Sequence, residues 1–261
     1  MSAARIVFIG GLLSYRALFN WLNPWIFIPT LVLLPIFQIL LFAFMGRQAN
    51  LESDQFFVIG NAVQSASTPC LWGMTSAIAG ERSSRTLGLL LASPAPRVAT
   101  FVGRAIPVIA NAWIVSLISF AVGAWLLRVD LPPSRWPAIA VLVLVGSVSC
   151  TGLALVLAAI SLRVRDTATL ANSMYGVLLI FCGVNVPLAA LPGWMPAVSA
   201  WLPLTRTIEA TREVAAGASL GHVGGLVLHE LALTSGYLLL GICILRYFEA
   251  SSRAKATLEV V

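Results

Sequence analysis

Charge is scarce in this sequence. Only 10% of its 261 residues are Asp, Glu, Lys or Arg, whereas 59% are hydrophobic. A soluble globular domain carries about 25% charged and roughly 45–50% apolar residues, so a chain of this composition exposes too little surface to water to be a soluble enzyme. The composition predicts one integral membrane domain over residues 1–261, and hydropathy is the first guide to its organisation.

Lysine and histidine are nearly absent, which excludes several kinds of functional site. The one lysine, Lys255, lies in the C-terminal tail, so a phosphate-binding loop of the form G-x-x-x-x-G-K-[ST] is impossible. The two histidines, His222 and His229, cannot form an H-E-x-x-H zinc site, and neither has an evident nucleophile partner. We therefore expect no enzyme activity, metal or cofactor in this chain, and an intramembrane enzyme is the weakest alternative. Four cysteines lie inside apolar runs without metal-ligand spacing and are interpreted as packing residues: Cys70, Cys150, Cys182 and Cys243.

Long uncharged intervals divide the chain into six predicted transmembrane helices, and the expected fold is an all-α integral membrane fold. About 20 residues, at 1.5 Å rise per residue, cross a ~30 Å hydrocarbon core. The sixth span is long enough only if it includes Glu230. Because an ionisable group inside a span is expensive, Glu230 is interpreted as interfacial, with a substrate or proton site as the alternative. The predicted spans are about 24–45, 56–79, 104–127, 137–162, 169–189 and 225–247.

The distribution of basic residues predicts the orientation in the membrane. The net charge is +6, and a cytoplasmic N-terminus places most of the arginines in cytoplasmic segments, in agreement with the positive-inside rule. Basic charge in a membrane protein marks such loops, so we expect no nucleic-acid partner. The prediction is a multi-pass protein of the cell membrane (plasma or bacterial inner membrane), in contact with lipid, with both termini cytoplasmic. Before the first span, Arg5, Arg16 and Asn20 share one arc of a helical projection, which predicts a cytoplasmic amphipathic helix at the N-terminus.

Between the second and third spans, a segment that begins polar and ends in leucines is predicted to form a short amphipathic helix on the cytoplasmic surface. It starts at Glu81 and stops at Ser93-Pro94, because a residue before proline leaves the helical region. It is either a connector whose Arg82 and Arg85 contact phospholipid headgroups, or a docking element for a soluble partner.

After the fifth span, prolines interrupt the helical pattern and predict a broken helical hairpin at the outer leaflet. Within it, Glu209 and Arg212 are three residues apart on one helical face and can pair. Such a pair would neutralise both charges in a low-dielectric interface. Gly217 is placed to end this helix as a C-cap.

These two segments resemble parts of the permeases of type-2 ABC exporters (ABC-2 type permeases). The cytoplasmic loop of that family has an acidic-basic start, Thr-Leu, a leucine run and Ser-Pro. Its outer hairpin has a proline-broken segment before a helix with an acidic-x-x-Arg pair. This sequence departs from the family at Arg85, where glycine is common, and at Gly88, where an acidic residue is common. The resemblance implies a coupling helix with the ATPase-coupling residues Glu81, Arg82, Arg85, Thr86, Leu87, Leu90 and Leu91, and an outer hairpin marked by Trp194, Pro203, Glu209 and Arg212.

The same resemblance implies a transport subunit that is not itself an enzyme. Such permeases work as dimers with a second copy or a homologous permease, and each half docks on a nucleotide-binding ATPase subunit that holds ATP and Mg. We expect an exporter of an amphipathic or lipid-like compound (a drug, an antibiotic or a glycan-lipid) from the cytoplasm or inner leaflet. The alternative is an ion-gradient-driven secondary transporter, but the inverted repeat and midplane charge expected of one are not found. The substrate, and the choice between homodimer and heterodimer, stay open.

Polar residues in the second span fall on one helical stripe, which cannot face lipid because its polar groups would be unsatisfied. The stripe must face protein, water or substrate. Helix packing through interhelical hydrogen bonds is an equal alternative to a pathway role for the second span, and the favoured interpretation for the fifth. The translocation-pathway candidates are Asn61, Gln64, Ser65, Thr68 and Trp72, with Asn172 from the fifth span.

Overall fold

The computed structural model describes residues 25, 28–83, 97–161, 164 and 166–254, with the side chains of 77–83, 97–102 and 248–254 left out. These residues are mainly helical and include no strand, which confirms the all-α prediction for this part of the chain. The predicted N-terminal amphipathic helix lies outside it. The helices are η1 (Ile28–Leu33), α3 (Leu34–Gln48), α4 (Asp54–Ser65), α5 (Ser67–Ser83), α7 (Arg97–Leu126), η2 (Pro133–Arg135), α8 (Trp136–Ser161), α9 (Thr167–Phe181), η3 (Leu188–Ala190), α10 (Met195–Ser199), α11 (Thr205–Ala216) and α12 (Gly224–Ala254).

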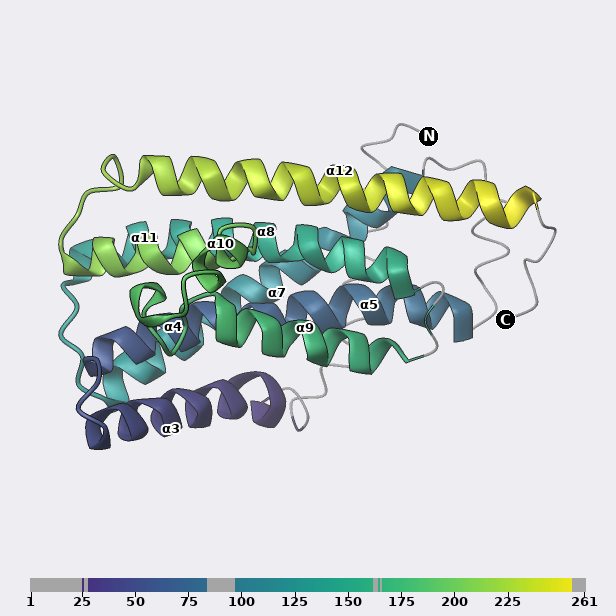
Figure 1. The fold of residues 1–261 in the computed structure, drawn as a ribbon. Helices are drawn as coiled ribbons and strands as arrows, with labels where there is room; N and C mark the ends of the chain where they lie inside the picture. The colour runs from purple at the N-terminus through teal and green to yellow at the C-terminus, as the bar shows by residue number, and fades with distance from the viewer. Residues whose placement is uncertain (1–24, 26–27, 84–96, 162–163, 165, 255–261) are drawn as a thin grey trace.

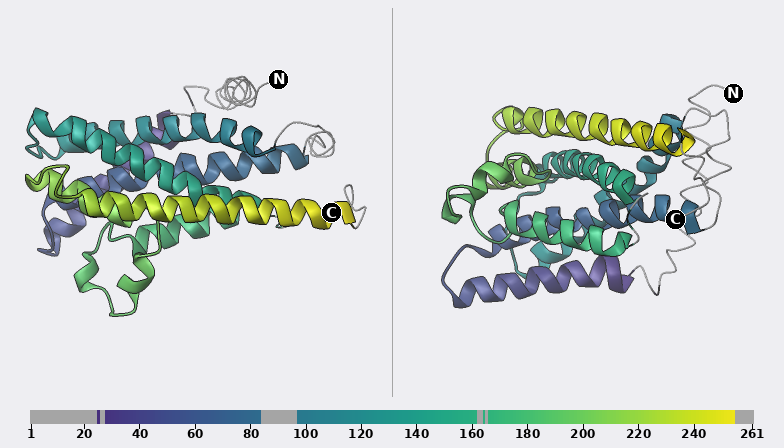
Figure 2. Two further views of the ribbon diagram at one scale, coloured as in Figure 1. Left: turned by 90° about the horizontal axis from the view of Figure 1, so that it is seen from above. Right: turned by 45° about the vertical axis from the view of Figure 1, so that its right-hand side comes forward.

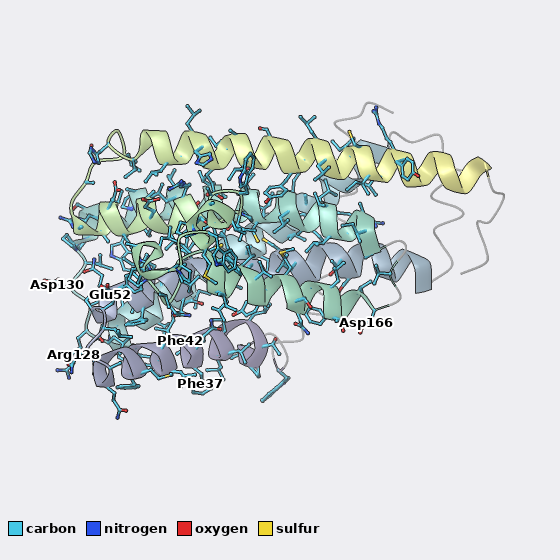
Figure 3. The ribbon with its side chains drawn as sticks, viewed as in Figure 1. Phe37, Phe42, Glu52, Arg128, Asp130 and Asp166 are labelled. Carbon is cyan, nitrogen blue, oxygen red and sulfur yellow. The ribbon has the colours of Figure 1, made fainter. Side chains whose placement is uncertain are left out.

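The long helices lie side by side along one axis and alternate in direction, with α4 and α5 together making one pass (Figure 1). The connections at residues 49–53, 127–132 and 217–223 gather at the left end of the bundle in that view. Glu52, Arg128 and Asp130 lie at this end, and Asp166 lies toward the opposite end (Figure 3). Charged residues thus flank a largely apolar middle, as expected of helices that cross a bilayer.

Four helices in the described part of the chain are long and apolar enough to cross a membrane: Ile28–Gln48, Gly103–Leu126, Pro133–Ser161 and Gly224–Tyr247. They correspond to the predicted first, third, fourth and sixth spans. The chain is therefore a multi-pass helical membrane protein.

The second predicted span, 56–79, consists of two helices that meet at Ala66. The cause is Pro69, which has no N–H to donate to the Ser65 carbonyl and whose ring crowds that carbonyl. The helical path nevertheless continues, because the Cys70 N–H bonds the Ala66 carbonyl at 3.4 Å. The pass is one broken helix rather than one straight helix.

The fifth predicted span, 169–189, is wrong at its outer end, because α9 stops at Phe181. Gly183 adopts a positive φ of 70°, which ends right-handed helical geometry, and Pro187 cannot continue it. At 1.5 Å per residue, the 15 residues of α9 extend only about 22 Å. This is shorter than a ~30 Å hydrocarbon core.

Helix α8 packs between α5 and α12 at the centre of the bundle. Gly152 on α8 faces Tyr237, and Gly241 on α12 faces Leu155; a Cβ added at these glycines would lie 3.3 Å and 3.0 Å from the facing side chains. Glycine therefore allows the two helices to approach closely. By contrast, α3 turns large apolar side chains outward, including Phe37 at 64% exposed (Figure 3), as a surface that faces lipid does.

Candidate translocation site and outer hairpin

A group of four uncharged polar side chains, here called the polar node, joins α3, α4, α9 and the connection after α9: Gln38, Asn61, Tyr175 and Asn185. The Asn61 amide donates to Asn185 Oδ1 at 2.7 Å and to the Phe57 carbonyl at 2.9 Å. Gln38 Nε2 donates to Asn61 Oδ1 at 3.0 Å, and the Tyr175 hydroxyl donates to Gln38 Oε1 at 2.6 Å. These bonds form one continuous chain across the three helices.

The members of the polar node differ in exposure. Asn61 is 2% exposed, and the two hydrogens of its amide are both bonded. Gln38, Tyr175 and Asn185 are half-buried, and their amide or hydroxyl groups can each make more bonds than those given above. The node can therefore accept a further polar group at its outer members while both amide hydrogens of Asn61 stay bonded.

Two other pathway candidates, Gln64 and Ser65, lie at the junction of α4 and α5. Gln64 is fully buried, and its Nε2 donates to Ser67 Oγ at 3.2 Å. The Ser65 hydroxyl donates to the Ala62 carbonyl at 2.6 Å, within its own helix. Of the predicted stripe, the structure thus places only Asn61 in the polar node, while these two residues are enclosed by the bundle.

The remaining pathway candidates lie nearer the surface. Thr68 and Trp72 are half-buried on α5, and Asn172 is exposed on α9 beside the exposed Ser173. Gly176, one turn further along that face, has no atom within 4 Å of an added Cβ. This face of α9 therefore does not pack against the described part of the chain, and the packing interpretation of the fifth span stays a prediction. The pathway role of these residues stays a prediction.

The predicted ATPase-coupling segment falls largely outside the structure's described residues. Glu81 and Arg82 belong to the last turn of α5, and their side chains are not described. Their role stays a prediction, as does that of the undescribed Arg85, Thr86, Leu87, Leu90 and Leu91.

The outer hairpin is broken into η3, α10 and α11. The part with η3 and α10 projects from the side of the bundle near the end of α9 (Figure 2, left), whereas α11 packs against α8 and α12. Trp194 is 60% exposed, and its ring centroid lies 5.8 Å from that of Phe181. Pro203 is buried, and its carbonyl accepts a bond from Cys182 Sγ at 3.2 Å. Both contacts hold the hairpin against the end of α9.

Arg212, on α11, bonds to main-chain carbonyl groups of other segments. Its Nη1 donates to the Gly183 carbonyl at 2.9 Å, and its Nη2 donates to the carbonyls of Val184 at 3.0 Å and Phe56 at 3.2 Å. The guanidinium carbon also lies 3.5 Å from the Phe56 ring centroid, within cation–π range. The first two carbonyls follow the end of α9, where helical donors are lacking. Arg212 supplies the missing donors.

The predicted pairing of Glu209 with Arg212 is wrong. Glu209 accepts a bond from Arg206 at 2.8 Å, and Arg206 also donates to His229 Nδ1 at 3.2 Å. Spacing of three residues permits either pair, and tertiary contacts decide between them. Arg212 turns toward the bundle, where burial lowers the pKa of its guanidinium to about 10.

Glu230 is buried inside the protein, and its interfacial depth in the membrane stays a prediction. Its side chain is 0% exposed, and its Oε1 accepts a bond from the Leu204 N–H at 2.8 Å. A hydrogen-bond donor inside the protein replaces water at Oε1, while Oε2 has no partner among the described residues. Glu230 therefore connects α12 to the start of α11.

Sequence reasoning missed three members of the polar node and the glycine beside Arg212. Gln38 and Asn185 each stand alone among apolar neighbours, and an isolated polar residue in an apolar run was the available signal. Tyr175 closely follows Asn172 and Ser173 and is not isolated in this way. Nothing in the sequence around Gly60 indicated that its position requires glycine. A Cβ there would lie 2.2 Å from the Val184 carbonyl oxygen and 2.9 Å from Arg212 Nη2, so only glycine leaves room for that arrangement.

Among the described residues, no group of three or more His, Cys, Asp or Glu side chains could hold a metal ion. A family model described as ABC-2 type transporter matches residues 11–215, a range that includes the polar node and nearly all of α11 but not α12. A search of curated proteins finds no match to the chain.

Proposed function

Because the chain belongs to the ABC-2 type transporter family, we propose that it is the permease subunit of an ATP-driven exporter in the cell membrane. Permeases of this family generally work with an ABC ATPase subunit, and in this proposal that partner holds ATP and Mg. In this proposal the four long apolar helices, the α4–α5 pass, and α9 together with the segment that follows it make six crossings, with both termini cytoplasmic. A second permease, identical or homologous, completes the path.

The observation that supports a cargo-binding role is the polar node. All four of its side chains are uncharged, and three are half-buried within an apolar bundle. Amides and a phenol can bond hydroxyl or amide groups without neutralising a charge. The proposed cargo is therefore an amphipathic or lipid-like compound with an uncharged hydrogen-bonding headgroup, moved outward from the cytoplasm or inner leaflet.

The α4–α5 pass can transmit a movement caused by ATP binding on the partner subunit to the polar node. The last turn of helix α5, which ends at Ser83, includes the start of the predicted coupling segment, and α4 carries Asn61. Closure of the ATPase subunits would push the segment at residues 81–91, and the break at Ala66 lets α4 reorient relative to α5. Energy enters because the partner contacts the two permease states differently. The polar node is then reshaped by the same motion.

The test is to purify the chain together with the ATPase subunit encoded beside it and to reconstitute the complex in lipid nanodiscs. ATP hydrolysis is expected to rise with an alkyl glycoside, whose headgroup is uncharged, and less with an alkyl phosphate. The double variant Glu81→Ala, Arg85→Ala should lose this stimulation. The proposal fails if no ATPase subunit copurifies and this variant transports as well as the wild type. Transport that continues without ATP but collapses with the proton gradient would favour the secondary transporter.

A further inference from the structure

Glu230 is a fully buried carboxylate in an apolar helix, and nothing in the proposed transport path uses it. Its Oε1 accepts the Leu204 N–H at 2.8 Å, and the main-chain N–H groups of Arg206 and Thr207 lie near the carboxyl group, although its Oε2 has no hydrogen-bond partner among the described residues. These N–H groups belong to the first turn of α11, where no donor has a partner within the helix. Glu230, on α12, is thus placed to cap α11, a helix that is not its own.

The start of α11 needs such a cap. Leu204, which stands in the N-cap position, has no side-chain cap bond and adopts a left-handed conformation with φ of 73°. That conformation is disfavoured for residues other than glycine, so surrounding contacts must hold it. Gly146 on α8 supplies one of them, because a Cβ there would lie 3.1 Å from the Leu204 side chain and 2.8 Å from that of Thr207.

The other end of α11 is held by the opposite charge. Arg135, in η2, donates to the Ala215 carbonyl, and Gly217 ends the helix with φ of 120°, which confirms its predicted C-cap position. A carboxylate at the N-terminus and a guanidinium at the C-terminus both complement the helix dipole. With Arg212, α11 has three anchors with ionisable side chains, which fix it to α12, η2 and α4.

We propose that Glu230 is a positioning residue for transport: by capping α11 from α12, it sets the place of the outer hairpin and, through Arg212, the place of Asn185 in the polar node. The linkage is continuous, because Arg212 holds the carbonyls of Gly183 and Val184, and Asn185 follows directly in the chain. The capping of α11 by Glu230 does not depend on the proposed function. The effect of Glu230 on transport rests on the proposed function.

Cys182 is a native reporter of this cap. It is 1% exposed, and its Sγ donates to the carbonyl of Pro203, the residue before Leu204. If the start of α11 leaves its place, Cys182 loses this cover and reacts with N-ethylmaleimide. Cys243 is exposed and serves as the internal reference, with both sites quantified by mass spectrometry of the reconstituted protein.

Glu230→Ala should label Cys182 about tenfold faster than the wild type, because loss of a helix cap shifts an opening equilibrium by about that factor. Glu230→Asp, one methylene shorter, should behave similarly. Glu230→Gln keeps an acceptor for the Leu204 N–H and should label at an intermediate rate. Glu213→Gln, which removes a half-buried carboxylate from the same helix, is the control and should label as the wild type does.

Wild-type labelling rates in folded Glu230→Ala and Glu230→Asp proteins would overturn the proposal. If these variants do not fold, hydrogen exchange of the wild type decides, since slow exchange of the Leu204, Arg206 and Thr207 amides is expected and fast exchange overturns the cap. In the transport assay, Glu230→Ala should retain basal ATP hydrolysis and lose most glycoside stimulation. Faster labelling with unchanged stimulation would overturn the link to the node. Failure of the proposed function appears separately, as wild-type protein without glycoside-stimulated ATP hydrolysis.

Discussion

The polar node and the anchors of α11 are both polar regions inside an apolar bundle, but they are built from different partners. In the node, uncharged side chains bond mainly to one another, as Tyr175 does to Gln38. At the anchors, charged side chains bond to main-chain groups, as Arg212 does to Val184 and Glu230 to Leu204. A main-chain group cannot rotate away, whereas two side chains can exchange rotamers and partners. The anchors are therefore suited to fix a scaffold, and the node is suited to rearrange.

The anchors and the polar node also differ in charge, since the anchor side chains are arginine and glutamate and those of the node are uncharged. Removal of one partner from a buried ionisable group is costly. An uncharged amide loses less when a bond breaks, and water or a guest molecule can replace the partner at the half-buried residues. The largest effects on stability should therefore come from the anchors, and effects on cargo response from the node.

Arg212→Ala should have the largest effect. It removes three hydrogen bonds to carbonyl groups and the contact with the Phe56 ring, and we expect a loss of about 2–4 kcal/mol in the free energy of unfolding. Denaturant titration of the purified protein measures it. Arg212→Lys should recover only part of the loss, because one ammonium cannot reach several carbonyls and stack on the ring. An unchanged midpoint for Arg212→Ala would mean that this anchor does not fix the hairpin.

Gly60→Ala tests the same anchor from the opposite side. The added Cβ would overlap the Val184 carbonyl and crowd Arg212, and such overpacking costs about 1–3 kcal/mol. Gly176→Ala is the matched control, since nothing lies within 4 Å of its added Cβ and alanine is favoured in a helix by about 0.5–1 kcal/mol. Equal thermal midpoints for the two variants would contradict the crowding at Gly60.

Tyr175→Phe should change stability less and cargo response more. The lost bond to Gln38 Oε1 is worth about 1 kcal/mol at most, and water can reach Gln38 because it is half-buried. We expect the alkyl glycoside concentration for half-maximal ATPase stimulation to rise about fivefold, the equivalent of ~1 kcal/mol. A large drop in thermal midpoint with an unchanged half-maximal concentration would make the node a structural element rather than a cargo site.

The two regions also differ in how far the sequence reveals them. Apolar intervals predict most of the helices, and Pro192 and Pro203 predict that the outer hairpin is broken, because these signals act locally along the chain. The partners of Arg212 and Glu230 could not be predicted, because main-chain carbonyl and N–H groups are the same at every residue and leave no mark in a sequence. Asn61 could be singled out by its side chain, while its partner Asn185, 124 positions away, depends on the fold.

Asp166 separates the effect of charge from the effect of burial, and its variant should show the smallest effect. Like Glu230, it caps a helix, since the Thr169 hydroxyl and the N–H groups of Thr169 and Ala168 bond its carboxylate, but it is exposed at the opposite end of the bundle (Figure 3). These bonds hold the pKa of Asp166 below its usual value. Its stabilisation is therefore complete above the usual pKa of about 4 and is lost as the pH falls through the lowered pKa.

Asp166→Asn keeps the shape of the side chain but does not titrate. The thermal midpoint of the wild type should exceed that of this variant by a small margin near neutral pH, and the margin should shrink below about pH 4. A margin that does not change with pH would show that the charge contributes nothing to this cap. A margin as large as that of Glu230→Ala would show that burial is not what makes the anchors of α11 strong, because solvent screens an exposed charge far more than a buried one.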